Sequence, residues 1–104
     1  MNKEEIKAFV ANPGREGLYK FIRKDGSIRF RKYKEKLWYE GVGPDVDRSE
    51  EQAIKRSLSS VHPHGEDWAR RDLSNGATVE WFANLDGSTT KPQEALFVQL
   101  DLFL

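Results

Sequence analysis

The chain of 104 residues contains no cysteine. This absence excludes disulfides, thiolate metal sites and thiol nucleophiles, so packing alone must stabilise the fold. The chain also has no run of about twenty apolar residues, the length that a membrane-spanning helix requires. Its first residues, Met1-Asn2-Lys3-Glu4-Glu5, lack the basic and then apolar pattern of a secretory signal. We therefore expect a cytoplasmic protein that engages no membrane.

Net charge is absent as well, because 17 Lys and Arg residues balance 17 Asp and Glu residues. The neutral sum conceals an uneven distribution along the chain. From residue 41 onward six basic residues face eleven acidic ones. Between residues 18 and 40 three acidic residues accompany eight basic ones: Lys20, Arg23, Lys24, Arg29, Arg31, Lys32, Lys34 and Lys36. A neutral total is therefore no argument against an anionic partner.

What is present suits one small domain, because 38% hydrophobic and 12% aromatic residues can bury a single modest core. Asn2, followed three residues later by Glu5, is a capping-box pattern and predicts a helix through Ile6 and Val10. The Asn-Pro-Gly sequence at 12–14 ends that helix.

A β-hairpin is predicted around Asp25-Gly26, a dipeptide that accepts the positive φ angles of a type I′ turn. Its strands cover 18–24 and 27–39. A two-residue loop places Lys24 opposite Ser27, and that register fixes which side chains share a face. We expect the core face to carry Tyr19, Phe21, Ile28 and Phe30.

The second half predicts two helices and two strands. Ser49 and Gln52 form another capping-box pattern, which begins a helix over about 50–60, and a short helix follows over 66–73. Alternating apolar residues predict strands over about 77–84 and 95–102 that pair with each other. The fold class is therefore α+β, with a hairpin over about 18–39, a C-terminal strand pair and two or three short helices. We place the domain at 1–98 and a separate peptide at 99–104.

Motifs for catalysis are missing. The chain has no glycine-rich phosphate loop, no nucleophile elbow and no acidic pair followed by lysine at nuclease-like spacing. We therefore expect that the protein is not an enzyme, has no catalytic residue and binds no cofactor. His62 and His64, with Glu66 and Asp67 nearby, are residue types that bind divalent metals. Histidines after a helix also solvate a loop or contact the last helical carbonyls, so we assign no metal site.

The basic hairpin is a candidate nucleic-acid surface. Cationic side chains on a strand contact phosphates while an interleaved aromatic ring stacks on a base of DNA or RNA. The residues assigned to this surface are Lys20, Lys24, Arg29, Arg31 and Tyr33. The alternatives are a solvated face, lysines that protect a strand edge, or an acidic protein partner.

The last residues carry a more specific signal. Gln99-Leu100-Asp101-Leu102-Phe103 resembles, at all five positions, the pentapeptide by which bacterial replication and repair proteins bind the β sliding clamp of DNA polymerase III. The resemblance covers five residues and implies a partner, not a fold. It implies that Gln99 occupies the polar end of the clamp cleft, that Leu102 and Phe103 occupy its hydrophobic end, and that Asp101 points outward.

The same segment also fits a core strand, because Leu96, Val98, Leu100, Leu102 and Leu104 alternate. Our leading hypothesis is a small non-enzymatic adaptor or inhibitor that binds the clamp and acts on DNA replication or repair. Its size is similar to that of phage or mobile-element accessory proteins. The alternatives are a nucleic-acid-binding module that uses the hairpin, or an inhibitor of a host defence complex.

Overall fold

The computed structural model describes residues 1–89, which form three helices and four strands. In chain order these are α1 (Lys3–Ala11), β1 (Gly17–Ile22), β2 (Ile28–Lys34), β3 (Leu37–Trp38), α2 (Glu50–Leu58), α3 (Glu66–Ser74) and β4 (Thr78–Ala83). The α+β class predicted from the sequence is confirmed.

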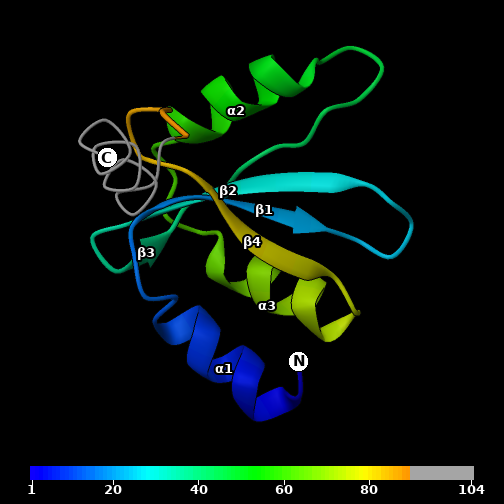
Figure 1. Cartoon of the computed structure of the whole chain (residues 1–104), viewed down its shortest axis with the longest axis vertical. Coiled ribbons are helices and arrows are strands. Elements are labelled where there is room, and N and C mark those ends of the chain that lie inside the picture. The colour runs from blue at the N-terminus through cyan, green and yellow to red at the C-terminus, as the bar shows by residue number, and fades with distance from the viewer. Residues whose placement is uncertain (90–104) are drawn as a thin grey trace, which may run out of the picture.

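The four strands form one antiparallel sheet in the order β3-β2-β1-β4. Helix α2 lies against one face of this sheet, and α1 and α3 lie against the other (Figure 1). Residues 1–89 therefore form three layers, and the sheet is covered on both sides. Side chains on both faces of β1 and β2 must then be apolar or paired, because neither face meets bulk water over its whole length.

Both predicted capping boxes are present. The Asn2 side chain accepts a hydrogen bond from the Glu5 backbone N–H at 2.8 Å, and the Glu5 carboxylate accepts one from the Asn2 N–H at 2.8 Å. Ser49 and Gln52 make the equivalent pair at 3.1 and 2.8 Å. These contacts satisfy backbone donors that a helix start leaves without partners, which is why both helices begin where the sequence predicts.

The predicted hairpin exists, but its register differs by one residue. Arg23, not Lys24, lies opposite Ser27: the Arg23 N–H donates to the Ser27 carbonyl at 2.9 Å. The loop holds three residues, 24–26, and Gly26 alone among them has a positive φ, of 88°. The Asp25 carboxylate accepts hydrogen bonds from both the backbone N–H and the hydroxyl of Ser27, at 2.9 and 2.7 Å. This side-chain bridge accompanies a three-residue loop in place of the predicted type I′ turn.

The register shift redistributes the side chains between the two faces. Tyr19 pairs with Arg31 and Phe21 pairs with Arg29, whereas Phe30 pairs with Lys20. Tyr19 and Phe21 therefore lie on the face covered by α1 and α3, and Phe30 lies on the α2 face. The predicted single core face of Tyr19, Phe21, Ile28 and Phe30 is wrong, because a one-residue slip moves every side chain of one strand to the opposite side.

A second turn divides the predicted strand 27–39. Lys34 pairs with Leu37, so Glu35 and Lys36 form a two-residue loop between β2 and β3. Their φ angles are 52° and 66°. Two successive positive φ angles are the signature of a type I′ turn, which asparagine and glycine adopt most easily. The prediction missed the turn because neither residue is of that type.

Each face of the sheet has its own hydrophobic cluster. The cluster on the α1 and α3 face contains Ile6, Val10, Tyr19, Phe21, Tyr33, Trp38, Ala69 and Leu73. The cluster on the α2 face contains Leu18, Phe30, Ala53 and Ala83. Trp38 anchors the first cluster: its indole N–H donates to the Val10 carbonyl at 2.8 Å, and its ring contacts those of Tyr19, Phe21 and Tyr33.

Strand β4 confirms the strand predicted over 77–84, and it pairs with β1. The strand predicted over 95–102, the domain boundary at residue 98 and the peptide 99–104 lie outside the described residues. In the part of the chain that the structure describes, no helix is long and apolar enough to cross a membrane.

Candidate functional site

The structure does not bring the five residues of the predicted nucleic-acid surface onto one face. Lys20 lies on the α2 face of the sheet, over the ring of Phe82, whereas Arg29 and Arg31 lie on the opposite face. Lys24 is exposed in the hairpin loop. A single strand of DNA or RNA cannot contact both faces of a covered sheet at these positions, so the surface as predicted does not form.

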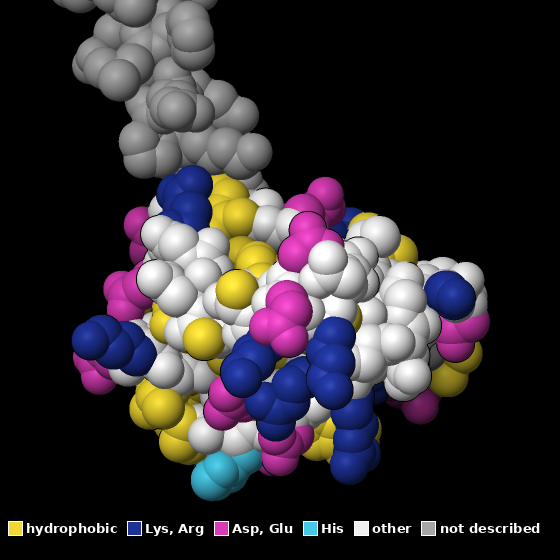
Figure 2. All heavy atoms as spheres, turned by 90° about the horizontal axis from the view of Figure 1, so that it is seen from below, with side chains coloured by type: hydrophobic (Ala, Val, Ile, Leu, Met, Phe, Trp, Pro, Cys, Tyr) yellow, Lys and Arg dark blue, Asp and Glu magenta, His cyan; other side chains and the backbone are white. Residues whose placement is uncertain are grey.

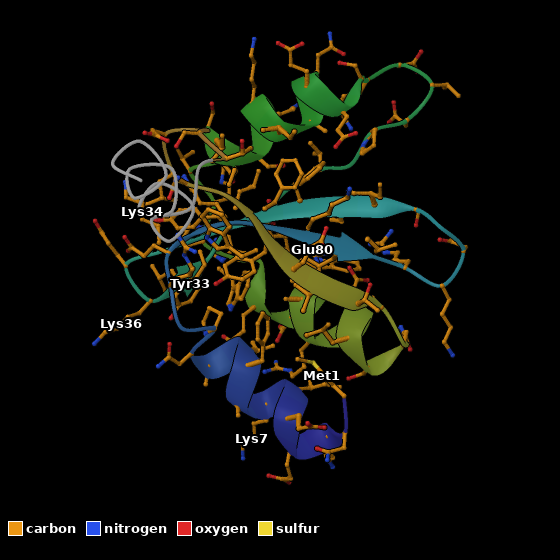
Figure 3. The ribbon with its side chains drawn as sticks, viewed as in Figure 1. Met1, Lys7, Tyr33, Lys34, Lys36 and Glu80 are labelled. Carbon is orange, nitrogen blue, oxygen red and sulfur yellow. The ribbon has the colours of Figure 1, made fainter. Side chains whose placement is uncertain are left out.

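Tyr33, the ring assigned to base stacking, belongs to the core. It is 6% exposed, and its ring centroid lies 5.0 Å from that of Trp38. Figure 3 shows Tyr33 within the body of the protein, whereas Lys36 extends outward from the turn that follows β2. A ring packed in this way is not available to a base. The phosphate and stacking roles assigned to this hairpin therefore need other residues.

Lys32 also has a structural role. Its ammonium donates to the backbone carbonyls of Leu58 and Ser60, at 3.0 and 2.8 Å, where α2 ends. It also lies 4.4 Å from the centre of the Tyr39 ring. Burial lowers the pKa of Lys32, and the charge of Lys34 lowers it further. A basic side chain near the last carbonyls of a helix interacts favourably with the negative end of the helix dipole and so stabilises the helix.

Arginine side chains gather on the other face, where the hairpin meets α3. Arg23 contacts Asp72 of α3 through two hydrogen bonds, from Nε to Oδ1 at 3.0 Å and from Nη2 to Oδ2 at 3.3 Å. Arg31 donates from Nη2 to the same Oδ2 at 2.9 Å. The register explains this convergence, because residues 23, 29 and 31 all point to the side that α3 covers. One carboxylate thus serves two guanidinium groups.

Arg29 lies beside this pair and forms no ion pair within residues 1–89. Its Nε is buried without an acceptor there, and so is Nη1 of Arg31. Burial lowers the pKa of Arg29, and the neighbouring Arg23 lowers it further. Burial is also the largest cause that lowers the pKa of Arg31, whereas the hydrogen bond that Arg31 donates to Asp72 raises it. Three cationic groups therefore lie near one buried carboxylate, and only Arg23 and Arg31 contact it.

These groups line a cavity of about 180 Å³ between the hairpin, the start of the segment after β3 and α3. We call it the guanidinium cavity. Its lining residues are Arg23, Arg29, Arg31, Glu40, Gly41 and Trp68. Gly41 is required at its wall, since a Cβ on this residue would lie 1.6 Å from the Phe30 carbonyl oxygen. Trp68 is 51% exposed.

The view from below shows how charge is arranged over one side of the molecule (Figure 2). Lys and Arg side chains gather near the middle of this side, and acidic side chains lie among them. The side as a whole therefore does not present one sign of charge. A long polyanion gains most from a continuous basic stripe, whereas a small anion needs only a local excess of positive charge.

The histidines do not form a metal site with their neighbours. His62 and His64 are exposed, and the backbone carbonyl of His62 accepts a hydrogen bond from the Glu40 N–H at 2.8 Å. Within residues 1–89 no three His, Asp or Glu side chains are grouped so as to hold a metal ion.

Comparisons with protein-family models, with curated proteins and with solved structures give no match to this chain.

Of the guanidinium cavity and its ion pair, only Arg29 and Arg31 were among the site residues predicted from the sequence. The residues without a predicted functional role were Arg23, Glu40, Gly41, Trp68 and Asp72. The available signal was the position of Asp72 in α3, because it lies on the same helical face as Ala69 and Leu73, which are buried. A carboxylate in an apolar stripe usually has a buried cationic partner.

Proposed function

We propose that this chain is a non-enzymatic binding protein that contacts the bacterial β sliding clamp through Gln99-Leu100-Asp101-Leu102-Phe103. The observation that carries the proposal is the match of this segment to the clamp-binding pentapeptide at all five positions. The chemistry of the segment supports it. Leu100, Leu102 and Phe103 are large apolar anchors, and Gln99 is a polar group that can orient an extended peptide in a preformed cleft.

The domain supports this role indirectly. Residues 1–89 enclose hydrophobic clusters on both faces of their sheet, so they can act as a folded body to which a short binding peptide is attached. A peptide of five residues binds weakly on its own, because ordering it costs conformational entropy. A protein that holds such a peptide either recruits its domain to the clamp or competes there with other clients that carry the same motif.

The test is binding of the purified full-length protein to a purified bacterial clamp, measured by surface plasmon resonance. The decisive variant is Leu102→Ala with Phe103→Ala, which removes two of the proposed anchors. The chain offers a matched control, because Leu96-Phe97 is the same dipeptide outside the pentapeptide. Leu96→Ala with Phe97→Ala removes the same atoms and leaves the motif intact.

We expect the wild-type protein and the control variant to bind, and the Leu102 and Phe103 variant to lose at least tenfold in affinity, since interface anchors cost about 2 kcal/mol or more each when truncated. Thermal unfolding of each variant separates this loss from a loss of fold. Binding that persists in a folded Leu102 and Phe103 variant would exclude the proposal. A pull-down that recovers nucleic acid or a defence complex, with no clamp, would favour one of the alternative functions.

A further inference from the structure

The guanidinium cavity has more positive charge than residues 1–89 neutralise. Arg23 and Arg31 pair with the buried carboxylate of Asp72, Arg29 has no ion pair within residues 1–89, and Glu40 adds a second carboxylate to the lining. Three positive charges against two negative charges leave a net excess of one. Glu40 is exposed, so water screens its charge more than that of the buried Asp72. Guanidinium groups remain protonated in proteins, and the site cannot relieve this excess by losing protons.

The N–H groups of these arginines that have no acceptor also indicate an anionic ligand. Arg31 is only 3% exposed, and its Nη2 holds Asp72 while its Nη1 has no acceptor in the described part of the chain. The Nε atom of Arg29 is also buried and has no acceptor within residues 1–89. A buried N–H donor without an acceptor costs about as much as a lost hydrogen bond, and such donors in native proteins generally have a partner. Two of them on neighbouring residues, both lining one cavity, indicate a ligand with several acceptor oxygens.

From these observations we propose that the guanidinium cavity binds a single phosphate group in its dianionic form. A phosphate group has three or more acceptor oxygens and a charge of about −1.5 to −2 near pH 7, so it supplies acceptors for the unpaired donors and negative charge for the positive excess. A carboxylate has a smaller charge and fewer acceptor oxygens, so we expect it to bind more weakly at this site. This site lies in the folded domain and does not depend on the proposed clamp peptide.

The residues beside the phosphate site indicate which chemical group the ligand can carry in addition to its phosphate. The ring of Trp68 lines the cavity and is half exposed, and the Arg71 guanidinium lies 5.1 Å from its centre on a neighbouring turn of α3. A flat group attached to the phosphate would therefore find an aromatic surface beside the anion site. Two sources supply the same phosphate chemistry: free inorganic phosphate, and a mononucleotide whose base stacks on Trp68.

Isothermal titration of the full-length protein with inorganic phosphate, at about pH 8 in a chloride buffer, tests the proposal. The informative variant is Arg29→Gln, because Arg29 forms no ion pair within residues 1–89 and its loss leaves the Asp72 contacts in place. Arg56→Gln is the matched control, because this exposed arginine lies on α2, at the opposite face of the sheet.

We expect saturable phosphate binding by the wild type, a loss of about tenfold or more in Arg29→Gln, and no change in Arg56→Gln, since one charge-assisted hydrogen bond corresponds to roughly that factor. Acetate at the same ionic strength should compete poorly. Absence of saturable phosphate binding, equal binding by Arg29→Gln, or equal competition by acetate would each overturn the proposal.

A titration with adenosine 5′-monophosphate then separates the two sources. Tighter binding than that of phosphate, reduced to the phosphate level in Trp68→Ala, identifies a mononucleotide as the class of ligand. Equal binding of the two ligands, unchanged in Trp68→Ala, identifies free phosphate. Both results support a phosphate site.

Discussion

Arg31 of β2 and Asp72 of α3 form a buried ion pair, with 2.9 Å between Nη2 and Oδ2, across 41 residues of sequence. Arg31 also lies over the ring of Phe21, 4.6 Å from its centre. The pair joins the hairpin to the last turn of α3 at the edge of a hydrophobic cluster. A charge so placed depends on its partner, because burial removes the water that would otherwise stabilise it.

Replacement of Asp72 should therefore destabilise the protein strongly. Asp72→Asn keeps the size of the side chain but leaves the Arg31 charge without a counterion, and we expect a loss of about 3–5 kcal/mol in the free energy of unfolding. Urea denaturation measures this loss. Asp67→Asn is the matched control, because Asp67 lies on the same helix at an exposed position. Similar stability of the two variants would contradict the structural role of the pair.

Lys32 should stabilise the end of α2. In Lys32→Met the apolar chain remains, but the carbonyls of Leu58 and Ser60 lose their donor, and we expect a cost of about 1–3 kcal/mol. Hydrogen exchange should show faster opening of the last turn of α2. Lys34→Met removes an exposed lysine two residues further along the same strand and should change little. Equal effects of both substitutions would mean that the contacts to α2 contribute no stability.

The buried phenol of Tyr19 should make the free energy of unfolding depend on pH in the alkaline range. Burial raises the pKa of Tyr19 above its usual value of 10.0, and the phenol donates to the Arg15 carbonyl at 2.7 Å. The folded state therefore keeps this proton at a pH where the unfolded chain has lost it. The contribution of Tyr19 to stability is complete below about pH 10 and falls as the pH rises through the raised pKa.

Tyr19→Phe isolates that contribution, because every other titrating group is common to both proteins. The difference in unfolding free energy between wild type and Tyr19→Phe should be constant from about pH 7 to pH 9 and then decrease. Denaturant unfolding at a series of pH values measures it. A difference that grows above pH 10 would show that the folded state favours the phenolate.

The Glu35-Lys36 turn offers a stabilising change. Both residues have positive φ angles, which cost about 1–2 kcal/mol each in residues other than glycine and asparagine. Glu35→Asn with Lys36→Gly should raise the stability by about 1 kcal/mol after the greater entropy of unfolded glycine is included. The backbone N–H of Glu35 still donates to Glu16. Glu35→Ala with Lys36→Ala removes the same side chains and should bring no gain; an equal rise in melting temperature for both variants would disprove this account of the turn.

Local signals determined much of this fold. The two capping boxes, the Asn-Pro-Gly sequence that ends α1, and the alternation in β4 each act over a few residues, so the sequence predicts these elements closely. The α+β class follows from them. The pentapeptide 99–103 is also a sequence signal, and it remains a prediction.

The tertiary structure alone decided the hairpin register, and with it the site. Asp25-Gly26 is compatible with a two-residue or a three-residue loop, and the choice between them moves Phe30 away from Tyr19 and brings Arg23, Arg29 and Arg31 together against α3. The deciding contacts join residues 41 and 49 positions apart. No local pattern contains them, because they arise only when α3 packs against the hairpin. The same packing placed Arg31 and Tyr33, two residues of the predicted nucleic-acid surface, in the interior.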